Sequence, residues 1–424
     1  MQHLNALERK VIFLSTLGGA LELYDFIIYV FLAGTLSELF FPHQNSLASL
    51  MEVFGVFAIG YFVRPLGGII FSHFGDKYGR KKSFMLTLML MALPTFLMGL
   101  LPTSQSIGVW AAVLLVSLRL LQGLAIGGEI PGAITFAGEH VNPLYRGLTC
   151  GIIFFGINLG LMLGSGMNVL LGTTLNHQQF ISWGWRIPFL LGGLLGVLSF
   201  YLRRQLTETP IFLNYSKKLQ DESIPLIVAL KSHPKALLRG VALTALGATN
   251  ISLLFLYVPT YFSSVLHYPK DLVNQLNTLN IFLFSGLLIL TAWLSDRLGR
   301  RLLLRIGSLG FVLLAYLLFF WLTEEKISHL IIVMIIFSVL GACVQGVFAC
   351  TLIELFPTQI RYTGTALTYN LGFAIFGGLA PLTATYLISK TGDLAAPAYY
   401  LMAAAFLCFI ATLGLKNKQS CELG

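Results

Sequence analysis

Twelve apolar runs, each long enough to cross a lipid bilayer, limit how this 424-residue sequence can fold. A transmembrane helix needs about 20 predominantly apolar residues. Hydrophobic residues make up 56% of the chain, charged residues only 11%, and the mean hydropathy is +0.80. This composition excludes a soluble enzyme, a nucleic-acid-binding protein and a secreted disulfide scaffold, and it predicts an all-α integral membrane protein. The predicted spans are 11–36, 50–74, 83–101, 108–131, 146–172, 184–202, 236–265, 273–295, 302–322, 328–352, 362–389 and 394–415.

The distribution of basic residues predicts how the spans are oriented. If the N-terminus is cytoplasmic, most of the 27 Lys and Arg residues fall in cytoplasmic segments, as the positive-inside rule requires. The net charge of +9 therefore reflects orientation in the bilayer and not binding to DNA. The first apolar run is too long for a signal-peptide core, and we interpret it as a retained span. We expect a multi-pass protein of the cell inner membrane with both termini in the cytoplasm.

A long polar stretch divides the chain into two similar halves. It covers residues 203–235, which we interpret as a cytoplasmic linker between two six-helix bundles, 1–202 and 236–424. The sequence GDKYGRKK at 75–82 follows the second span, and SDRLGRR at 295–301 follows the eighth. Recurrence at equivalent places in two halves indicates a duplicated, pseudo-symmetric fold.

A second signature recurs after the fourth and tenth spans. Glu139 and Arg146 are seven residues apart with a Pro between them, and Glu354 and Arg361 repeat this spacing. Charges at helix ends can form ion-pair clusters that break when one side of a transporter opens. The alternative is that these charges only set the orientation of the spans. The predicted gating residues are Asp76, Arg80, Glu139, Arg146, Asp296, Arg300, Glu354 and Arg361.

These motifs resemble those of the major facilitator superfamily. Its best-known signature lies between the second and third spans, as GDKYGRKK does here, and the RLLQG sequence at 119–123 resembles a second motif. The sequence resembles more closely the metabolite:proton symporters, and within them the proline/betaine members. Those members carry a C-terminal coiled-coil extension, whereas this sequence ends shortly after its last predicted span. The more specific matches are GGALELYDFIIY, RPLGG, RLLQGLAIGGE, WGWRIPF, ATNISLLFLYVPTYF, LHYPKD, LFPTQIRY and APAYYLM.

Charged residues inside predicted spans are the first candidates for function, because a charge in hydrocarbon is costly. Asp25 and Glu22 lie near the middle of the first span, and Arg119 lies near the middle of the fourth. An Asp25–Arg119 pair could keep the carboxylate ionised until a proton or substrate competes for it. We therefore predict that Asp25, Glu22 and Arg119 couple transport to protons. A static ion pair between the two spans is the alternative.

The substrate site is predicted from polar groups in both halves. Arg64 is the candidate for a substrate carboxylate, because a guanidinium matches two carboxylate oxygens; the alternative is that Arg64 extends to the membrane surface. Tyr residues of the second half could hold a quaternary ammonium, although they could also only pack between helices. The predicted substrate-binding residues are Arg64, Tyr29, Gln122, Asn250, Tyr257, Tyr261, Tyr369 and Asn370.

The remaining features narrow the class of protein. No Cys-x-x-Cys pair, nucleotide-binding signature or large loop occurs, which argues against a membrane enzyme and a transporter-like sensor, and no metal or cofactor is expected. Glycines at four-residue spacing, Gly156, Gly160 and Gly164, indicate close helix packing. No Pro interrupts them, so they do not match the antiporter signature of the superfamily that the sequence resembles, which disfavours an antiporter. We predict a monomeric proton-coupled symporter of a small zwitterion such as proline or betaine. Small mono- or dicarboxylates are the alternative substrates, and Na⁺ is the alternative ion.

Overall fold

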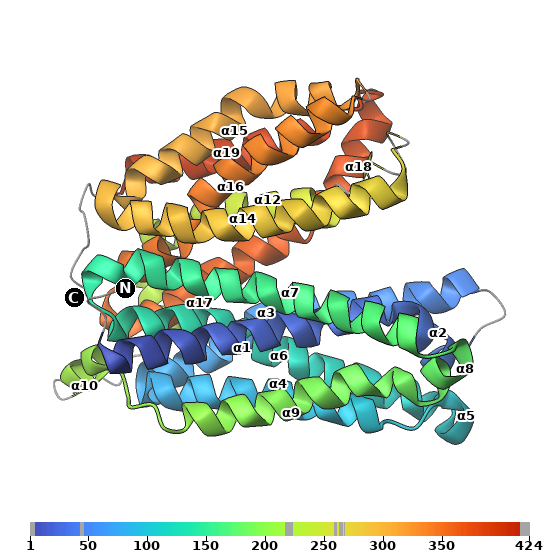
Figure 1. Cartoon of the computed structure of the whole chain (residues 1–424). Coiled ribbons are helices and arrows are strands. Elements are labelled where there is room, and N and C mark those ends of the chain that lie inside the picture. The colour runs from blue at the N-terminus through green and yellow to red at the C-terminus, as the bar shows by residue number, and fades with distance from the viewer. Residues whose placement is uncertain are drawn as a thin grey trace. The chain divides into compact units, whose positions relative to one another are not determined.

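The structure, a computed structural model, describes residues 5–42, 46–216, 224–257, 261–262, 266, 268–324 and 326–415. Every regular element in these ranges is a helix, so the prediction of an all-α fold is confirmed (Figure 1). The longer helices are α1 (Ala6–Phe31), α2 (Ala33–Phe40), α3 (Ser46–Tyr78), α4 (Arg80–Leu100), α6 (Val109–His140), α7 (Arg146–Thr174), α9 (Arg186–Arg203), α11 (Pro225–Ser232), α12 (Pro234–Ile251), α14 (Lys270–Leu298), α15 (Arg300–Leu322), α16 (Ile327–Leu355), α17 (Arg361–Gly372), α18 (Ala380–Thr391) and α19 (Pro397–Leu413). The shorter elements are α5 (Ser104–Ile107), η1 (Pro143–Tyr145), α8 (His177–Gln179), η2 (Phe180–Gly184), α10 (Pro210–Ser216), η3 (Ser252–Tyr257), η5 (Thr358–Ile360) and η6 (Phe373–Gly377).

Among the described residues, eleven helical segments are long and apolar enough to span a membrane, and α19 adds a shorter apolar helix of 17 residues. Together they correspond to the twelve predicted spans. The first helix ends earlier than predicted, at Phe31, and α2 follows as a separate helix. The seventh predicted span becomes α12 followed by the π-helical η3, and its residues 258–260 and 263–265 lie outside the described ranges.

Local sequence explains several helix ends. The side chain of Asn5 accepts a hydrogen bond from the backbone N–H of Glu8, while the Glu8 carboxylate accepts one from the backbone of Asn5, both at 2.8 Å. This capping box satisfies two N–H groups that have no partner inside the helix. Pro234 and Pro397 stand at the starts of α12 and α19, where a missing N–H costs nothing.

The chain forms two compact units. One contains Met1–His140 and Gly156–Gln220, and the other contains Val141–Phe155 and Asp221–Gly424. The helix α7 therefore begins in the second unit and continues into the first. The proposed division into bundles 1–202 and 236–424 with a linker at 203–235 stays a prediction, and residues 217–223 of that linker lie outside the described ranges.

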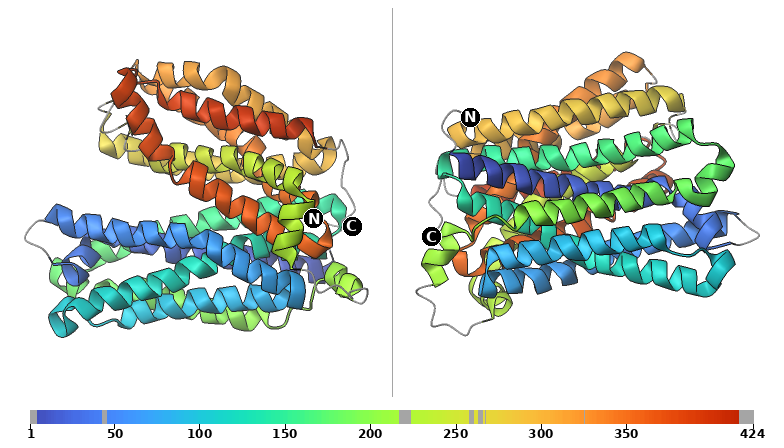
Figure 2. Two further views of the ribbon diagram at one scale, coloured as in Figure 1. Left: turned by 180° about the vertical axis from the view of Figure 1, so that it is seen from behind. Right: turned by 60° about the horizontal axis from the view of Figure 1, so that its bottom comes forward.

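The same helix pairings occur in both units. In the first unit α3 packs on α6, α4 packs on α6 and α9, and α1 packs on α6 and α9. In the second unit α14 packs on α16, α15 packs on α16 and α19, and α12 packs on α16 and α19. Figures 1 and 2 show α4, α6 and α9 side by side. The repeated sequence signatures thus correspond to a repeated arrangement of helices.

The two copies of the loop signature adopt the same backbone conformation. Gly79 has φ of 116° and Gly299 has φ of 92°, values that favour glycine because it lacks a side chain. Each glycine separates two long helices, and the Arg that follows it starts the next helix. The recurring Gly-Arg pair is therefore required by a tight connection between helices as well as by its charge.

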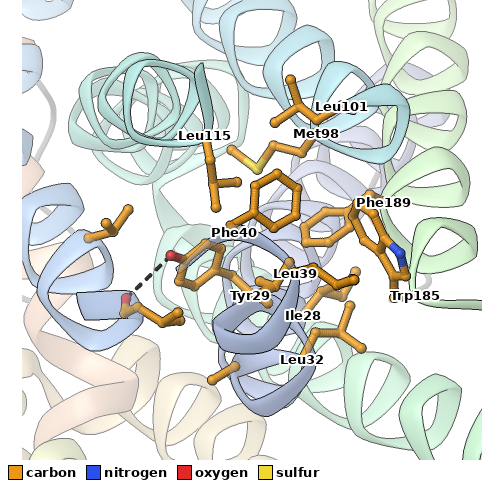
Figure 3. Packing of buried hydrophobic residues seen from close by; sticks show 14 of the residues in the cluster. Ile28, Tyr29, Leu32, Leu39, Phe40, Met98, Leu101, Leu115, Trp185 and Phe189 are labelled. Atoms are coloured by element: carbon orange, nitrogen blue, oxygen red, sulfur yellow. Dashed lines mark hydrogen bonds between the residues drawn. The ribbon is translucent and has the colours of Figure 1, made fainter. Parts of the chain in front are cut away.

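An aromatic and aliphatic cluster fills one end of the first unit. Figure 3 shows Phe40, Trp185 and Phe189 packed together, with the Phe40 and Trp185 rings edge to face at 5.6 Å between centroids. Other large apolar side chains, such as Phe62 on α3 and Leu313 on α15, are exposed. Exposed apolar faces on long helices suit a lipid environment.

The predicted glycine stripe of α7 lies against α1. A side chain at Gly156, Gly160 or Gly164 would meet Thr16, Ala20 or Ile27, respectively. For Gly160 the obstacle is the backbone carbonyl of Ala20, which cannot turn aside as a side chain can. The stripe therefore lets two helices of the first unit approach closely.

Candidate functional site

The helix α1 carries the two acids that were predicted to couple transport to protons. Glu22 and Asp25 are 3% and 1% exposed, and Tyr29, one turn after Asp25, is fully buried. The Tyr29 hydroxyl donates to the backbone carbonyl of Val53 on α3 at 3.3 Å (Figure 3). The Tyr29 hydroxyl is therefore held by α3, while its ring lies against the guanidinium of Arg119.

Asp25 and Arg119 are joined through two neutral side chains and form no direct ion pair. Thr95 Oγ1 on α4 lies 3.1 Å from Asp25 Oδ2, and Gln122 Nε2 on α6 donates to Thr95 Oγ1 at 2.9 Å. Arg119 donates to Gln122 Oε1, one turn away on α6, and to the carbonyl of Phe26 at 3.3 Å. The predicted pair is thus replaced by a hydrogen-bonded chain that runs from α1 through α4 to α6.

Thr95 can serve Asp25 in either protonation state. Its hydroxyl also lies 2.8 Å from the carbonyl of Met91, and it has a single proton to donate. When Asp25 is ionised, Thr95 donates to the carboxylate. When Asp25 is protonated, the carboxyl donates to Thr95 and the hydroxyl turns to Met91. Sequence reasoning missed Thr95, because a lone Thr in an apolar span carries no signal of this role.

The two guanidinium groups of Arg64 and Arg119 share an aromatic neighbour. Arg64 lies over the rings of Tyr61 at 4.1 Å and Phe26 at 4.6 Å, and Arg119 lies over Phe26 and Tyr29 at 4.5 Å each. Contacts of this kind stabilise a cation away from water. Arg64 is 9% exposed, so it is held inside the bundle and does not extend to the membrane surface.

A third buried basic residue pairs with Glu129. Arg203, at the end of α9, is fully buried and donates to Glu129 Oε1 at 2.8 Å and to the carbonyl of Leu14 at 3.2 Å. Thr87 donates to the other oxygen of Glu129 at 2.6 Å. The sequence assigned Arg203 to the cytoplasmic linker, because a basic residue at a helix end is typical of the membrane surface. The side chain turns into the bundle instead of lying at the surface, while the bounds of the linker stay a prediction.

One cluster of buried charges in the first unit, separate from the ion cluster of Asp76, Arg80 and Glu139, is balanced. Three acids, Glu22, Asp25 and Glu129, face three bases, Arg64, Arg119 and Arg203. A cavity of about 590 Å³ lies elsewhere in the unit, lined by residues that include Phe41 and Val109, and it shares no residue with this cluster. Within the described ranges, no three His, Cys, Asp or Glu side chains come together as metal ligands would.

The predicted gating residues Asp76, Arg80 and Glu139 of the first unit form a buried ion cluster. Arg80 contacts Asp76 at 2.5 Å and Glu139 at 3.4 Å, and Thr209 donates to Glu139 at 2.7 Å. Glu208, which no sequence signal singled out, accepts from the backbone N–H of Lys81 at the start of α4. An acid there completes the helix end, where N–H groups lack partners.

The second unit repeats the cluster and extends it to α7. Arg300 contacts Asp296 at 2.6 Å and Glu354 at 3.2 Å, and Arg146 lies 3.8 Å from Glu354. Asp296 also accepts hydrogen bonds from the backbone N–H groups of Gly147 and Leu148 at the start of α7, at 2.9 and 2.8 Å. Arg361 donates to the backbone carbonyls at 353 and 356 on the same chain segment. Seven of the eight predicted gating residues thus lie in two equivalent ion clusters.

The substrate-site candidates of the second unit have separate surroundings. Asn250 is fully buried beside Gly341 of α16, and neither of its amide atoms has a hydrogen-bond partner among the residues that the structure describes. Tyr257 and Tyr261 stack with centroids 5.8 Å apart, and the Tyr261 hydroxyl donates to a backbone carbonyl at 2.7 Å. Asn250 lies on the α-helix α12 and Tyr257 on the π-helical η3, which has a different helical period. The α-helical spacing that predicted one face for Asn250, Tyr257 and Tyr261 is therefore interrupted after Ile251.

Two further candidates lie on α17. The Tyr369 ring stacks on Phe348 with centroids 6.2 Å apart, and it also lies 4.6 Å from the ring of Phe373. Asn370 donates to the carbonyl of Ala366 in its own helix at 2.8 Å. Their role in substrate binding stays a prediction.

Comparisons with known proteins agree with this arrangement. Residues 13–381 match the family described as Major Facilitator Superfamily. The "Proline/betaine transporter" of Salmonella typhimurium is 35% identical, with 96% of this chain and 83% of that protein covered. The "Glycine betaine/proline/ectoine/pipecolic acid transporter OusA" of Dickeya dadantii is 36% identical with the same coverage.

Solved structures agree at the level of the fold. The proton:xylose symporter XylE has a TM-score of 0.78 at 17% identity, covering 96% of this chain and 95% of that chain. The human organic anion transporter MFSD10 has a TM-score of 0.70 at 19% identity, covering 96% and 100%. The chain therefore belongs to the major facilitator superfamily, with the twelve-helix fold of that family.

Proposed function

We propose that this chain is a secondary active transporter that takes up a small zwitterion, of the proline or betaine kind, together with a proton. It lies in the cell inner membrane with both termini in the cytoplasm, and its binding site opens in turn to the two sides of the membrane. The monomer is the working unit. Relatives at 35–36% identity that are named for proline and betaine support the substrate class. The observation that carries the proposal is the balanced set of buried charges in the first unit.

Charge balance favours a substrate without net charge. Glu129 is neutralised by Arg203, and Asp25 communicates with Arg119 through Thr95 and Gln122. Glu22 and Arg64 remain, one of each sign, so a zwitterion can place its carboxylate on Arg64 and its ammonium near Glu22. A dicarboxylate brings two negative charges, and uncompensated charge in a site of low dielectric constant is costly. Mono- and dicarboxylates are therefore the second candidates.

Asp25 is the group we assign to proton coupling, because its environment serves both protonation states. Thr95 can donate to the carboxylate or accept from the carboxyl without moving any helix. Glu22 assists from the same helix, and Arg119 stabilises the ionised form through the hydrogen-bonded chain. The clusters around Arg80 and Arg300 are assigned to gating, since such clusters can form in one state of the cycle and break in the other.

Uptake into proteoliposomes tests the proposal. Purified protein is reconstituted, and radiolabelled betaine or proline is offered with and without an inwardly directed proton gradient. We expect accumulation only with the gradient, and stronger competition at neutral pH from unlabelled proline or betaine than from citrate or succinate. A sodium gradient at constant pH is the control for the coupling ion. Saturable dicarboxylate binding that is lost in Arg64→Ala, but unaffected by excess proline or betaine, favours the second candidates.

A further inference from the structure

Glu22 and Arg203 are among the buried charged groups of the first unit that keep a hydrogen-bonding atom unused. Within the described part of the chain, Oε2 of Glu22 and Nη2 of Arg203 have no hydrogen-bond partner, although Glu22 is 3% exposed and Arg203 is fully buried. The remaining Arg203 nitrogens are used by Glu129 and by the carbonyl of Leu14. Oε2 of Glu22 can accept a hydrogen bond, and Nη2 of Arg203 can donate one. Buried charged groups are costly unless they are paired, so a contact between these two atoms is favourable.

Gly18 leaves room between these groups. The Arg203 guanidinium occupies the place that a side chain at position 18 would take, and Glu129 Oε1 lies beside it. Gly18 and Glu22 are four residues apart on α1, about 6 Å along the helix and on the same face. A helical side chain leans towards the N-terminus of its own helix, so Glu22 leans towards the turn that contains Gly18.

We propose that Arg203 receives the Glu22 carboxylate when Glu22 gives up its proton, which makes Glu22 and Arg203 the proton-release site of the transport cycle. The inference rests on the proposed proton-coupled function and deepens it. The proton passes from the Glu22 carboxyl to water at the end of the bundle where α1 starts. The Glu22 side chain then rotates towards the preceding turn of α1, and its carboxylate pairs with Nη2 of Arg203. Arg203 keeps its hydrogen bond to Glu129.

The charges around Glu22 fit this assignment. The charged groups that interact electrostatically with Glu22 are Asp25 of its own helix, Arg64 of α3, Glu129 of α6 and Arg203 of α9. Thr87, the residue of α4 that contacts Glu129, is uncharged. The acids oppose ionisation of Glu22, and the two bases favour it. A substrate carboxylate on Arg64 withdraws one of these bases, so Glu22 keeps its proton while substrate is bound. After the substrate has left, Arg203 completes the release.

A double variant tests the role of Arg203 separately from its structural pairing. Arg203→Gln alone leaves Glu129 as an uncompensated buried charge and can unfold the protein. The double variant Glu129→Gln/Arg203→Gln removes both charges and keeps hydrogen-bonding groups at both positions. The single variant Glu129→Gln is the matched control, because it retains the cation for Glu22.

Two transport modes separate proton release from the other steps. Substrate exchange across the membrane needs no loss of the proton, whereas accumulation driven by a pH gradient needs it. We expect the double variant to retain exchange, while its proton-driven accumulation falls about tenfold or more below that of Glu129→Gln. In infrared difference spectra, the protonated-carboxyl band that Glu22→Gln removes should persist to a pH about 1 unit or more higher in the double variant than in Glu129→Gln, because these two variants differ only in the Arg203 cation.

A glycine variant provides an independent measurement. The side chain of Gly18→Ala displaces the Arg203 guanidinium, which is the flexible end of a side chain, and should reproduce the double variant. Gly34→Ala on α2 is the control, since a side chain there meets nothing within 4 Å. If the double variant matches Glu129→Gln in both proton-driven accumulation and the pH at which the carboxyl band is lost, the inference is overturned. Absence of proton-driven uptake in the wild type itself overturns the proposed function instead.

Discussion

At the scale of single residues, the position of one hydroxyl group explains how a buried acid can exchange a proton. Asp25 lies in a helix where its carboxylate has no direct cation, and Thr95 is its hydrogen-bond partner. The adjacent carbonyl of Met91 gives the hydroxyl proton of Thr95 a second acceptor. Protonation at Oδ2 therefore rearranges hydrogen bonds and leaves neither this oxygen nor the Thr95 hydroxyl unpaired, which would cost about 1–3 kcal/mol.

The first prediction concerns Asp25. The variant Asp25→Asn keeps the size and hydrogen bonding of the protonated acid, but it cannot release a proton. We expect it to abolish substrate accumulation driven by a pH gradient and to retain substrate exchange. Both are measured with labelled substrate in proteoliposomes. Accumulation at the wild-type level would show that another group carries the proton.

The second prediction concerns Thr95. Thr95→Val preserves the shape of the side chain and removes the hydroxyl, so the ionised form of Asp25 loses its hydrogen bond. A hydrogen bond to a charged group contributes about 1.5–3 kcal/mol, which corresponds to a loss of proton-driven uptake of about tenfold or more. Because the ionised form is the one destabilised, the pH profile of uptake should move to higher pH. Thr95→Ser, the control, should follow the wild-type profile.

The sequence located the buried charges of this site but not all of their partners. Asp25, Glu22, Arg64 and Arg119 were found because a charge inside an apolar run is energetically costly and therefore indicates a specific role. Contacts between helices depend on tertiary packing, which a single sequence does not specify. Arg203 was missed for a related reason, because its position at a helix end is the same for a buried side chain and for one at the membrane surface.

At the scale of helices, the apolar runs predicted the spans well and their ends less well. The fourth span was predicted to end at Pro131, but α6 continues through this residue to His140. Neighbouring groups can satisfy the backbone freed by a proline inside a membrane bundle, so proline is a weaker stop signal there than in water. The π-helical segments η3 and η6 carried no sequence signal that we recognised.

The third prediction concerns the packing of α7 on α1. In Gly160→Ala, the added methyl group meets the backbone carbonyl of Ala20, which cannot give way without moving the helix. Overpacking of this kind costs about 1–3 kcal/mol, so the thermal unfolding temperature in detergent should fall. Gly172→Ala in the same helix meets nothing within 4 Å and should keep or raise it, since Ala favours helix more than Gly. Equal unfolding temperatures in the two variants would contradict close packing at Gly160.

At the scale of the whole molecule, the repeated signatures predicted a duplicated arrangement, and both units contain an Asp–Arg–Glu cluster. The fourth prediction is that Asp76→Asn and Asp296→Asn each slow transport about tenfold, as expected for the loss of a charged hydrogen bond. Substrate affinity, measured by equilibrium binding, should stay near the wild-type value because neither residue belongs to the proposed substrate site. Asp393→Asn, which lies outside both clusters, is the control. A large loss of affinity would place the clusters in the binding site instead.

The last prediction uses two native cysteines next to the second cluster. The Cys150 and Cys350 thiols are within hydrogen-bonding contact, and Cys350 Sγ lies 3.3 Å from Glu354 Oε1. Both cysteines belong to the second unit, Cys150 near the start of α7 and Cys350 on α16. If gating requires the start of α7 to leave Asp296 and Glu354, a covalent link between these cysteines must stop the cycle.

Oxidation with diamide, a membrane-permeant reagent that converts two thiols to a disulfide, provides this link. We expect it to abolish substrate transport while leaving substrate binding measurable, and we expect dithiothreitol to restore transport. The variant Cys150→Ser cannot form the link and should transport at the same rate with or without diamide, which separates this link from oxidation of Cys343, Cys408 or Cys421. Mass spectrometry verifies the disulfide. If protein fully cross-linked between Cys150 and Cys350 transports as fast as the reduced protein, then the start of α7 stays on α16 throughout the cycle, and the charged cluster beside it holds the fold together without gating it.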